Sequence, residues 1–207
     1  KLGALFMLGA LLAIASASGS VPIPAIGMEY GPLYARDQEQ PVYRLLQANL
    51  RYDNTDPGRF LSLVGRVQPD VITLNEVSQA WADKLALTES AYPYRIICPP
   101  LAGVWAVAIL SRRPFAAGEG PRCDPRGAFA TATFSFGGRW LSVGSMHLGW
   151  PWPFEQAWQV GGLAPYIASI GEPGILAGDM NAVPWSHTMA RVAQAGSFTL
   201  MPSPGPT

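Results

Sequence analysis

The sequence predicts a single α/β domain, α+β in character, built around mixed β-sheets. The chain has 207 residues, of which 49% are hydrophobic, so it is long enough to bury a sizeable core. Strand-length apolar runs are interspersed with helical patterns, and Gly137-Gly138 joins two of these runs as a hairpin turn. A hairpin inside such an order indicates a mixed sheet rather than a strictly alternating βαβ fold.

The individual elements follow from periodicity, capping residues and turn residues. Apolar and β-branched runs predict strands at 43–50, 70–77, 94–98, 104–110, 129–136, 139–148 and 174–179. Helical patterns predict helices at 56–68, 81–90, 154–170 and 186–195. Asp56 or Thr55 is expected near the N-cap of the first helix, and Ser78 at that of the second. The strand at 174–179 reads as fully buried, because its centre is Ile-Leu-Ala.

The charge balance argues against a protein that binds nucleic acid through a basic surface. Lys and Arg number 14, Asp and Glu number 14, and the formal net charge is zero. Binding to nucleic acid phosphates requires a cluster of cationic side chains, and no such cluster is present in the sequence. A nuclease is not excluded, because a bound metal ion supplies positive charge locally.

Residues 1–18 are predicted to be a transmembrane helix or a secretory signal peptide. An apolar or Gly run covers 2–15 behind Lys1 and is shorter than the roughly 20 residues of a membrane span. Small residues at 15–17 fit a signal-peptidase site. The chain opens on Lys rather than Met, which favours a helix that has lost upstream residues. We expect the domain to be membrane-anchored and periplasmic or, as the alternative, secreted.

The remaining chain divides into a linker and a globular domain. Pro-rich and Gly-containing residues 19–42 form the predicted linker, and 43–207 form the domain. In an oxidising compartment Cys98 and Cys123 are expected to pair, closing a loop worth about 3 kcal/mol, with free buried thiols as the alternative. Two Cys and two separated His do not make a zinc pattern.

Four predicted strands end in side chains that bind hard metal ions or transfer protons: Asn49, Glu76, His147, and Asp179 with Asn181. Each has an ordinary explanation as a loop or turn residue, a helix cap or a core imidazole. Their joint occurrence favours a site instead, because groups at one edge of a sheet pair share a pocket. We therefore expect Glu76, His147 and Asp179 to lie within roughly 10 Å of one another.

Several segments that contain these residues resemble the endonuclease/exonuclease/phosphatase family of metal-dependent phosphoesterases, in its bacterial membrane-anchored subgroup. The segments are, in chain order, QANLRYDN, PDVITLNEV, AILSRRP, SMHLGWPWP and ILAGDMNAVPWS. The resemblance covers roughly residues 43–186. It implies the DNase I-like four-layer sandwich, in which helices flank two mixed β-sheets.

The resemblance also implies a role for each residue. Glu76 would ligate Mg²⁺ or Mn²⁺, with Asn49 helping to hold the metal or a phosphate oxygen. Asp179 would orient or deprotonate the attacking water, while Asn181 and His147 would donate hydrogen bonds to the phosphoryl oxygens. The predicted activity is metal-dependent hydrolysis of a phosphoester in nucleic acid, phospholipid or a small molecule, by a monomer. Hard divalent ions prefer such oxygen ligands.

The chain departs from the family pattern at its end, and some residues stay without a role. The family closes with a strand ending in Asp-His, and no such pair follows Asn181. This predicts a domain that is incomplete at the C-terminus; the alternative is a catalytically degenerate, extracytoplasmic binding module. Trp150, Trp152 and Trp185 suggest stacking or interfacial contact, with core packing as the alternative. His187 is expected at the surface or beside the ligating residues.

Overall fold

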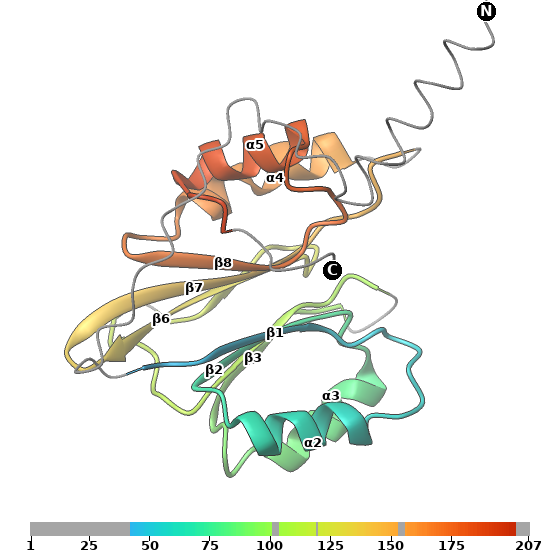
Figure 1. Ribbon diagram of the computed structural model, residues 1–207, viewed down its shortest axis with the longest axis vertical. Helices are drawn as coiled ribbons and strands as arrows, with labels where there is room; N and C mark the ends of the chain where they lie inside the picture. Colours follow the sequence, from blue (N-terminus) through green and yellow to red (C-terminus); the bar gives the residue numbers. More distant parts are fainter. Residues whose placement is uncertain (1–41, 101–103, 119, 153–155, 202–207) are drawn as a thin grey trace, which may run out of the picture.

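Two four-stranded sheets face each other, and helices cover the outer face of each (Figure 1). The computed structural model describes residues 42–100, 104–118, 120–152 and 156–201. The predicted membrane or signal segment, 1–18, lies outside the described residues, as does all of the linker except Val42. Within the described residues, no helix has the length and hydrophobicity to cross a membrane.

The first sheet has the strand order β1-β2-β4-β3, and the second has the order β5-β6-β7-β8. The strands are β1 (Leu45–Asn49), β2 (Val71–Asn75), β3 (Tyr94–Ile97), β4 (Ala108–Ser111), β5 (Arg122–Cys123), β6 (Phe129–Phe136), β7 (Arg139–His147) and β8 (Gly174–Asp179). The pairs β1–β2 and β7–β8 are parallel, and the other pairs are antiparallel. The mixed-sheet prediction is confirmed.

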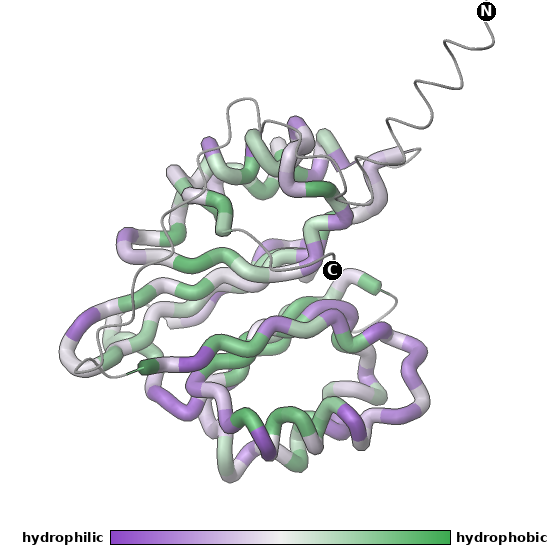
Figure 2. Tube along the Cα trace, in the orientation of Figure 1, coloured by the Kyte–Doolittle hydropathy of each residue, from purple (hydrophilic) through white to green (hydrophobic). Residues whose placement is uncertain are grey.

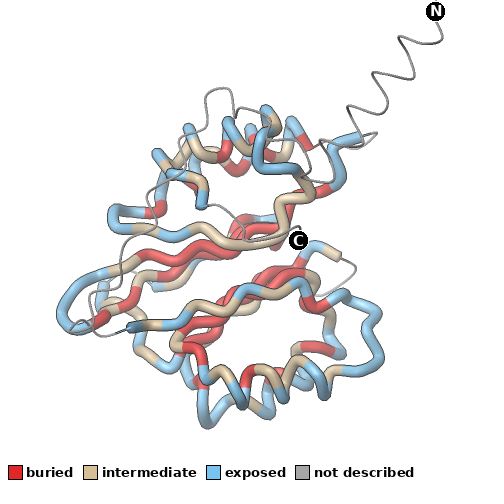
Figure 3. The backbone as a smooth tube through the Cα atoms, viewed as in Figure 1, coloured by how far each residue is buried: buried red, intermediate tan, exposed pale blue. Residues whose placement is uncertain are grey.

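Helices on opposite outer faces complete the four layers. The helices α2 (Gly58–Val67) and α3 (Gln79–Leu85), with the short 3₁₀ turn η1 (Ala86–Thr88), cover the first sheet. The helices α4 (Gln156–Ala168) and α5 (His187–Gly196) cover the second. Apolar residues concentrate on the strands (Figure 2), and the central strands are largely buried (Figure 3). The predicted four-layer sandwich is confirmed.

The alternation of side chains along β2 explains why both of its faces are buried. Val71 packs in the cluster between the sheets, whereas Ile72 and Leu74 pack under the helices with Trp81 and Leu85. A strand covered on both sides reads as a continuous apolar run, as this one does. A third cluster fills the space between β6, β7 and the helices α4 and α5.

The structure corrects three local predictions. The N-cap of α2 is Pro57, without a side-chain hydrogen bond, rather than Asp56 or Thr55. The strand expected at 104–110 is shorter, because Ala106 accepts from the Val77 amide and the Val107 amide donates to Gly127. The strand β8 is only partly buried, because it has one neighbouring strand and lies at the sheet edge. The Ser78 cap is confirmed, since its Oγ accepts from the Trp81 amide.

A disulfide joins Cys98 and Cys123, as predicted. Cys98 follows β3, the edge strand of the first sheet, and Cys123 belongs to β5, the edge strand of the second. The two sheets are therefore covalently linked along one edge of the sandwich. At the opposite edge β1 and β8 lie side by side (Figure 1).

Candidate active site

The ends of both parallel strand pairs meet at the same end of the sandwich. Asn49 pairs in register with Asn75, and His147 with Asp179. The two pairs are joined through the Asn75 side chain, which is fully buried. Its Nδ2 donates to the Met146 carbonyl at 3.0 Å, and its Oδ1 accepts from the Asp179 amide at 2.9 Å. One buried amide thus fixes the distance between the two strand ends.

Glu76 follows β2 directly, and both of its carboxylate oxygens accept hydrogen bonds. Oε1 accepts from Asn49 Nδ2 at 2.8 Å, and Oε2 accepts from the Tyr52 amide at 3.0 Å. Its side chain is only 16% exposed. Donors therefore orient both oxygens, and carboxylate oxygens are ligands that a hard divalent metal ion prefers.

Asn49 connects Glu76 to Asp179 through a single nitrogen atom. The same Nδ2 that donates to Glu76 also lies 3.0 Å from Asp179 Oδ2. Its Oδ1 accepts from the Arg51 amide at 2.8 Å, and a backbone amide can only donate. This contact therefore orients the Asn49 amide with its nitrogen toward the two carboxylates.

Arg51 follows Asn49 by two residues, but its guanidinium does not pair with these carboxylates. Its Nε lies 2.7 Å from Asp53, and this hydrogen bond raises the Arg51 pKa above its ordinary value. Among the described residues, no Lys or Arg forms an ion pair with Glu76 or Asp179. Two neighbouring carboxylates without a cationic partner attract a metal ion.

The His147 side chain is buried and faces Glu76. Its Nδ1 lies 2.7 Å from the Val104 carbonyl oxygen, which only accepts, so Nδ1 carries a proton. Its Nε2 lies 3.9 Å from Glu76 Oε1. The neutral ring therefore presents an acceptor toward the site, and donation from Nε2 to a ligand requires a second proton on the ring.

Asp179 and Asn181 form a turn that is also part of the site. Asp179 Oδ1 accepts from the Asn181 amide at 3.0 Å, as in an Asx turn. Asn181 Nδ2 donates to the Leu148 carbonyl at 2.7 Å, which ties this turn to the residue after His147. One amide hydrogen of Asn181 Nδ2 is thus engaged, and no acceptor among the described residues takes the second.

Unusual backbone conformations gather at these strand ends. Arg51, Glu76 and Asn181 have φ of 55°, 58° and 44°, in the left-handed region that side chains with a Cβ rarely occupy. Gly178, at φ 156°, passes so close to the neighbouring strand that a Cβ would collide with the Met146 carbonyl. The chain adopts these conformations where it turns the polar side chains toward one another.

Two glutamines of α4 support the same loops and were not predicted. Buried Gln156 donates from Nε2 to the carbonyls of Gly149 at 2.7 Å and Met180 at 3.1 Å. Gln159 donates to the His147 carbonyl at 2.9 Å and accepts from the Gly149 amide at 2.8 Å. Their signal in the sequence is weak, because glutamines in a helical pattern usually face solvent. His187 begins α5 and is exposed, as expected.

The site offers hard oxygen ligands but no complete protein cage for a metal. Glu76 and Asp179 supply carboxylate oxygens that are held by one shared donor. Within the described ranges, no group of three or more His, Cys, Asp and Glu side chains is arranged to hold an ion. Mg²⁺ is commonly bound by one or two carboxylates together with waters and substrate phosphate, so the residues present fit this ion.

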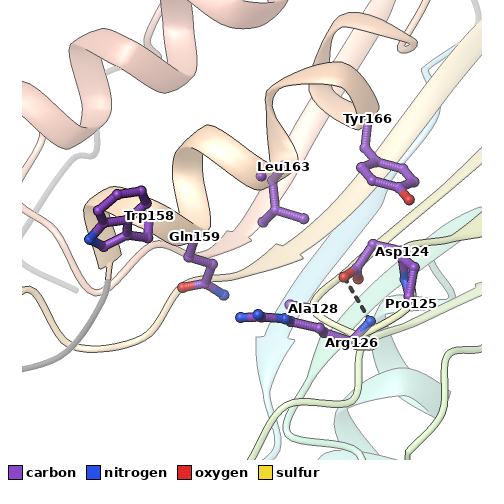
Figure 4. Close-up of a pocket in the computed structure, with 9 residues that line it drawn as sticks. Asp124, Pro125, Arg126, Ala128, Trp158, Gln159, Leu163 and Tyr166 are labelled. Atoms are coloured by element: carbon purple, nitrogen blue, oxygen red, sulfur yellow. Dashed lines mark hydrogen bonds between the residues drawn. The ribbon is translucent and has the colours of Figure 1, made fainter.

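Two open pockets are lined in part by residues that contact the site. One, of about 530 Å³, lies between the 124–128 loop and α4 and is lined by Arg126, Trp158, Gln159 and Tyr166 among others (Figure 4). Another, of about 380 Å³, is lined by residues that include Tyr52 and Lys84. The first shares Gln159 with the loop of His147, and the second shares Tyr52 with the Glu76 contact. Neither pocket is lined by Glu76, His147 or Asp179, and each meets the site only through one such contact residue.

Sequence comparison decides the family. The profile of the Endonuclease/Exonuclease/phosphatase family matches residues 46–206. The chain belongs to this family. Comparison with curated protein sequences finds no significant match. The match covers all five of the predicted site residues, whose individual roles stay predictions.

Solved structures of the same family fold resemble the chain. They include D. rerio TDP2 complexed with a single-strand DNA product (TM-score 0.58, 22% identity, 73% of this chain and 64% of that one). They also include sphingomyelinase C from Streptomyces griseocarneus (0.53, 21%, 76% and 70%) and Staphylococcus aureus beta toxin with bound magnesium ions (0.54, 16%, 74% and 69%). The chain spans about two thirds of the D. rerio TDP2 chains, 66% and 64%. At such identities the likeness shows a DNase I-like fold.

Proposed function

We propose that this chain is a metal-dependent hydrolase of phosphoester bonds. The observation that carries the proposal is the convergence of Glu76, Asp179 and His147, which lie at the ends of three strands in two sheets. One nitrogen of Asn49 joins the two carboxylates, and the His147 ring faces Glu76 at 3.9 Å. Turn-forming residues without a shared role would be distributed over different faces of the domain. Membership of the Endonuclease/Exonuclease/phosphatase family and the likeness to beta toxin with bound magnesium ions support the same activity.

In the proposed reaction a water oxygen attacks phosphorus and the bond from phosphorus to the leaving oxygen breaks. Glu76 is the residue proposed to hold Mg²⁺ or Mn²⁺, which would supply positive charge that polarises the phosphoryl oxygen. Asp179 orients the water and accepts its proton, and that proton later neutralises the leaving alkoxide. Asn181 and protonated His147 donate hydrogen bonds to the phosphoryl oxygens as negative charge develops.

Asn49 has a positioning role in this proposal. Its Oδ1 is engaged by the Arg51 amide, and its Nδ2 holds both carboxylates. It therefore assists metal binding by fixing Glu76 and Asp179.

We also propose that the domain lies outside the cytoplasm, anchored or secreted through residues 1–18. The Cys98–Cys123 disulfide supports this location, because disulfides persist in oxidising compartments.

The decisive variant is Glu76→Gln, which keeps the shape of the side chain and removes its charge. The full chain is expected to hydrolyse bis(p-nitrophenyl) phosphate with Mg²⁺ or Mn²⁺ and to lose this activity in EDTA. Glu76→Gln should lower kcat/KM at least about 1,000-fold and weaken metal affinity measured by calorimetry.

Glu89→Gln is the matched control, because Glu89 is exposed and follows η1, away from the strand ends. Its kcat/KM and metal affinity should equal those of the unaltered chain. Wild-type metal affinity in Glu76→Gln would refute the ligand assignment. A full chain that binds phosphate esters without hydrolysing them would instead support the degenerate binding module.

A further inference from the structure

Three tryptophans project from the two loops that follow the site strands. Trp150 and Trp152 lie in the loop after β7, and Trp185 lies in the loop after β8. They are 65%, 84% and 52% exposed, so core packing does not explain them. A soluble surface normally exposes such large apolar side chains singly, and a group of them marks an interaction site.

The described parts of these loops contain no charged residue. No Lys, Arg, Asp or Glu occurs at 148–152 or at 180–186, and the one charged residue in the sequence between β7 and α4 is an acid, Glu155. Val183, in the second loop, is 47% exposed. A surface that binds nucleic acid phosphates neutralises them with cations, and these loops have none. An uncharged, indole-rich surface is instead suited to the boundary of a zwitterionic bilayer, where indole rings place an apolar body in the lipid and an N–H in the headgroups.

The loops are held in place by buried polar contacts. Gln156 binds the carbonyls of Gly149 and Met180, one from each loop, and Asn181 Nδ2 binds Leu148. The tryptophans therefore project from a fixed backbone. They also adjoin the reactive groups, because His147 precedes the first loop directly and Asp179 directly precedes the second. Trp105, which is 41% exposed, extends this surface to 6.1 Å from the His147 ring.

We propose that the 148–152 and 180–186 loops form a membrane-interface surface, and that the substrate is a phospholipid presented in a bilayer. Docking of these tryptophans brings the end of the sandwich that carries Glu76 and Asp179 to the level of the lipid phosphate. The membrane-interface surface is inferred from the two loops alone, whereas the choice of substrate rests on the proposed phosphoester hydrolysis.

The test uses the full chain with vesicles of phosphatidylcholine whose acyl chains carry bromine, which quenches tryptophan fluorescence on contact. Residues 1–41 contain no tryptophan, so all of the fluorescence comes from the domain. The wild-type chain should be quenched, and the double variant Trp150→Ser/Trp152→Ser should lose at least about two thirds of that quenching.

Trp140→Ser is the matched control. Trp140 is 55% exposed, but it lies near the opposite end of β7, seven residues and roughly 23 Å from His147. This variant should keep the wild-type quenching by vesicles, and circular dichroism should report the same fold for all three chains.

The outcomes separate this inference from the proposed function. Wild-type quenching retained in Trp150→Ser/Trp152→Ser would overturn the surface, as would fluorescence that responds to single-stranded DNA and not to vesicles. A chain that hydrolyses a soluble phosphodiester but is not quenched by vesicles would overturn the inference alone. A chain that is quenched but hydrolyses no phosphoester would overturn the proposed function and leave the surface standing.

Discussion

The two edges of the sandwich are held together in different ways. At one edge the Cys98–Cys123 disulfide joins the β3 side of one sheet to β5 of the other. At the opposite edge β1 and β8 are connected by the hydrogen bond between Asn49 and Asp179. The covalent edge fixes the distance between the sheets, whereas the hydrogen-bonded edge carries the polar groups that a ligand must reach.

This difference shows where the proposed chemistry can rearrange. Hydrogen bonds between side chains exchange for bonds to a metal ion, water or phosphate at small net cost, because each donor and acceptor finds a new partner. A disulfide allows no such exchange. Variants that weaken each edge separately therefore test whether activity depends on the hydrogen-bonded edge and not on the disulfide edge.

The largest loss of stability is expected from Gly178→Ala at the hydrogen-bonded edge. An added Cβ would collide with the Met146 carbonyl while the backbone stays at φ 156°, which only Gly adopts easily. Chemical denaturation should show a free energy of unfolding about 4 kcal/mol lower, and phosphodiesterase activity should fall because Asp179 is displaced.

Gly65→Ala is the comparison for this variant. Gly65 lies inside α2, and a Cβ there meets no heavy atom within 4 Å. Alanine should raise the free energy of unfolding by about 1 kcal/mol, since Gly weakens a helix interior. Equal effects of the two substitutions would show that the close approach at Gly178 is not required.

Removal of the disulfide is expected to have the next largest effect. The variant Cys98→Ser/Cys123→Ser frees a loop of sequence separation 25, which should lower the free energy of unfolding by about 3 kcal/mol. At temperatures well below the unfolding midpoint, kcat/KM should stay within about twofold of the wild type, because the bridge lies at the other edge. A large loss of activity in folded protein would show that the two edges are coupled.

A smaller loss is expected from Asn75→Ala in the centre of the fold. This change leaves the Asp179 amide and the Met146 carbonyl without their side-chain partner. It should lower the free energy of unfolding, measured thermally or chemically, by about 2 kcal/mol.

Thr73, two residues earlier, has a buried Oγ1 without a hydrogen-bond partner among the described residues. Thr73→Val should therefore stabilise the chain by about 1 kcal/mol. The opposite signs distinguish a polar link from general sensitivity of β2.

Strand ends were predictable from the sequence, and the contacts between them were only partly so. Glu76, His147 and Asp179 each terminate an apolar run, which is visible locally, and their joint occurrence at strand ends predicted that they lie together. Asn75 was missed because it looks like the last residue of a buried strand. Its partners lie 71 and 104 residues away, and no local pattern reports bonds of that range.

Burial of the strands was harder to predict than their positions. Both β2 and β8 contain apolar runs, yet β2 is buried throughout while Ile175 of β8 is 40% exposed. The difference comes from sheet order, since β2 has two neighbouring strands and β8 has one. The two-residue strand β5 was missed because it is too short to show a pattern of its own. It is a strand only because it pairs with β6.

The edge position of β8 has a consequence for the lifetimes of the backbone amides around the site. Amides of β2 lie between two strands and are expected to exchange with deuterium only in large openings, whereas local fraying of the edge strand should expose those of β8. Glu76 and Asp179 are thus attached to segments that open at very different rates. Occupation of the site by a ligand should slow exchange in β8 far more than in β2, because only β8 has an open state that the ligand removes.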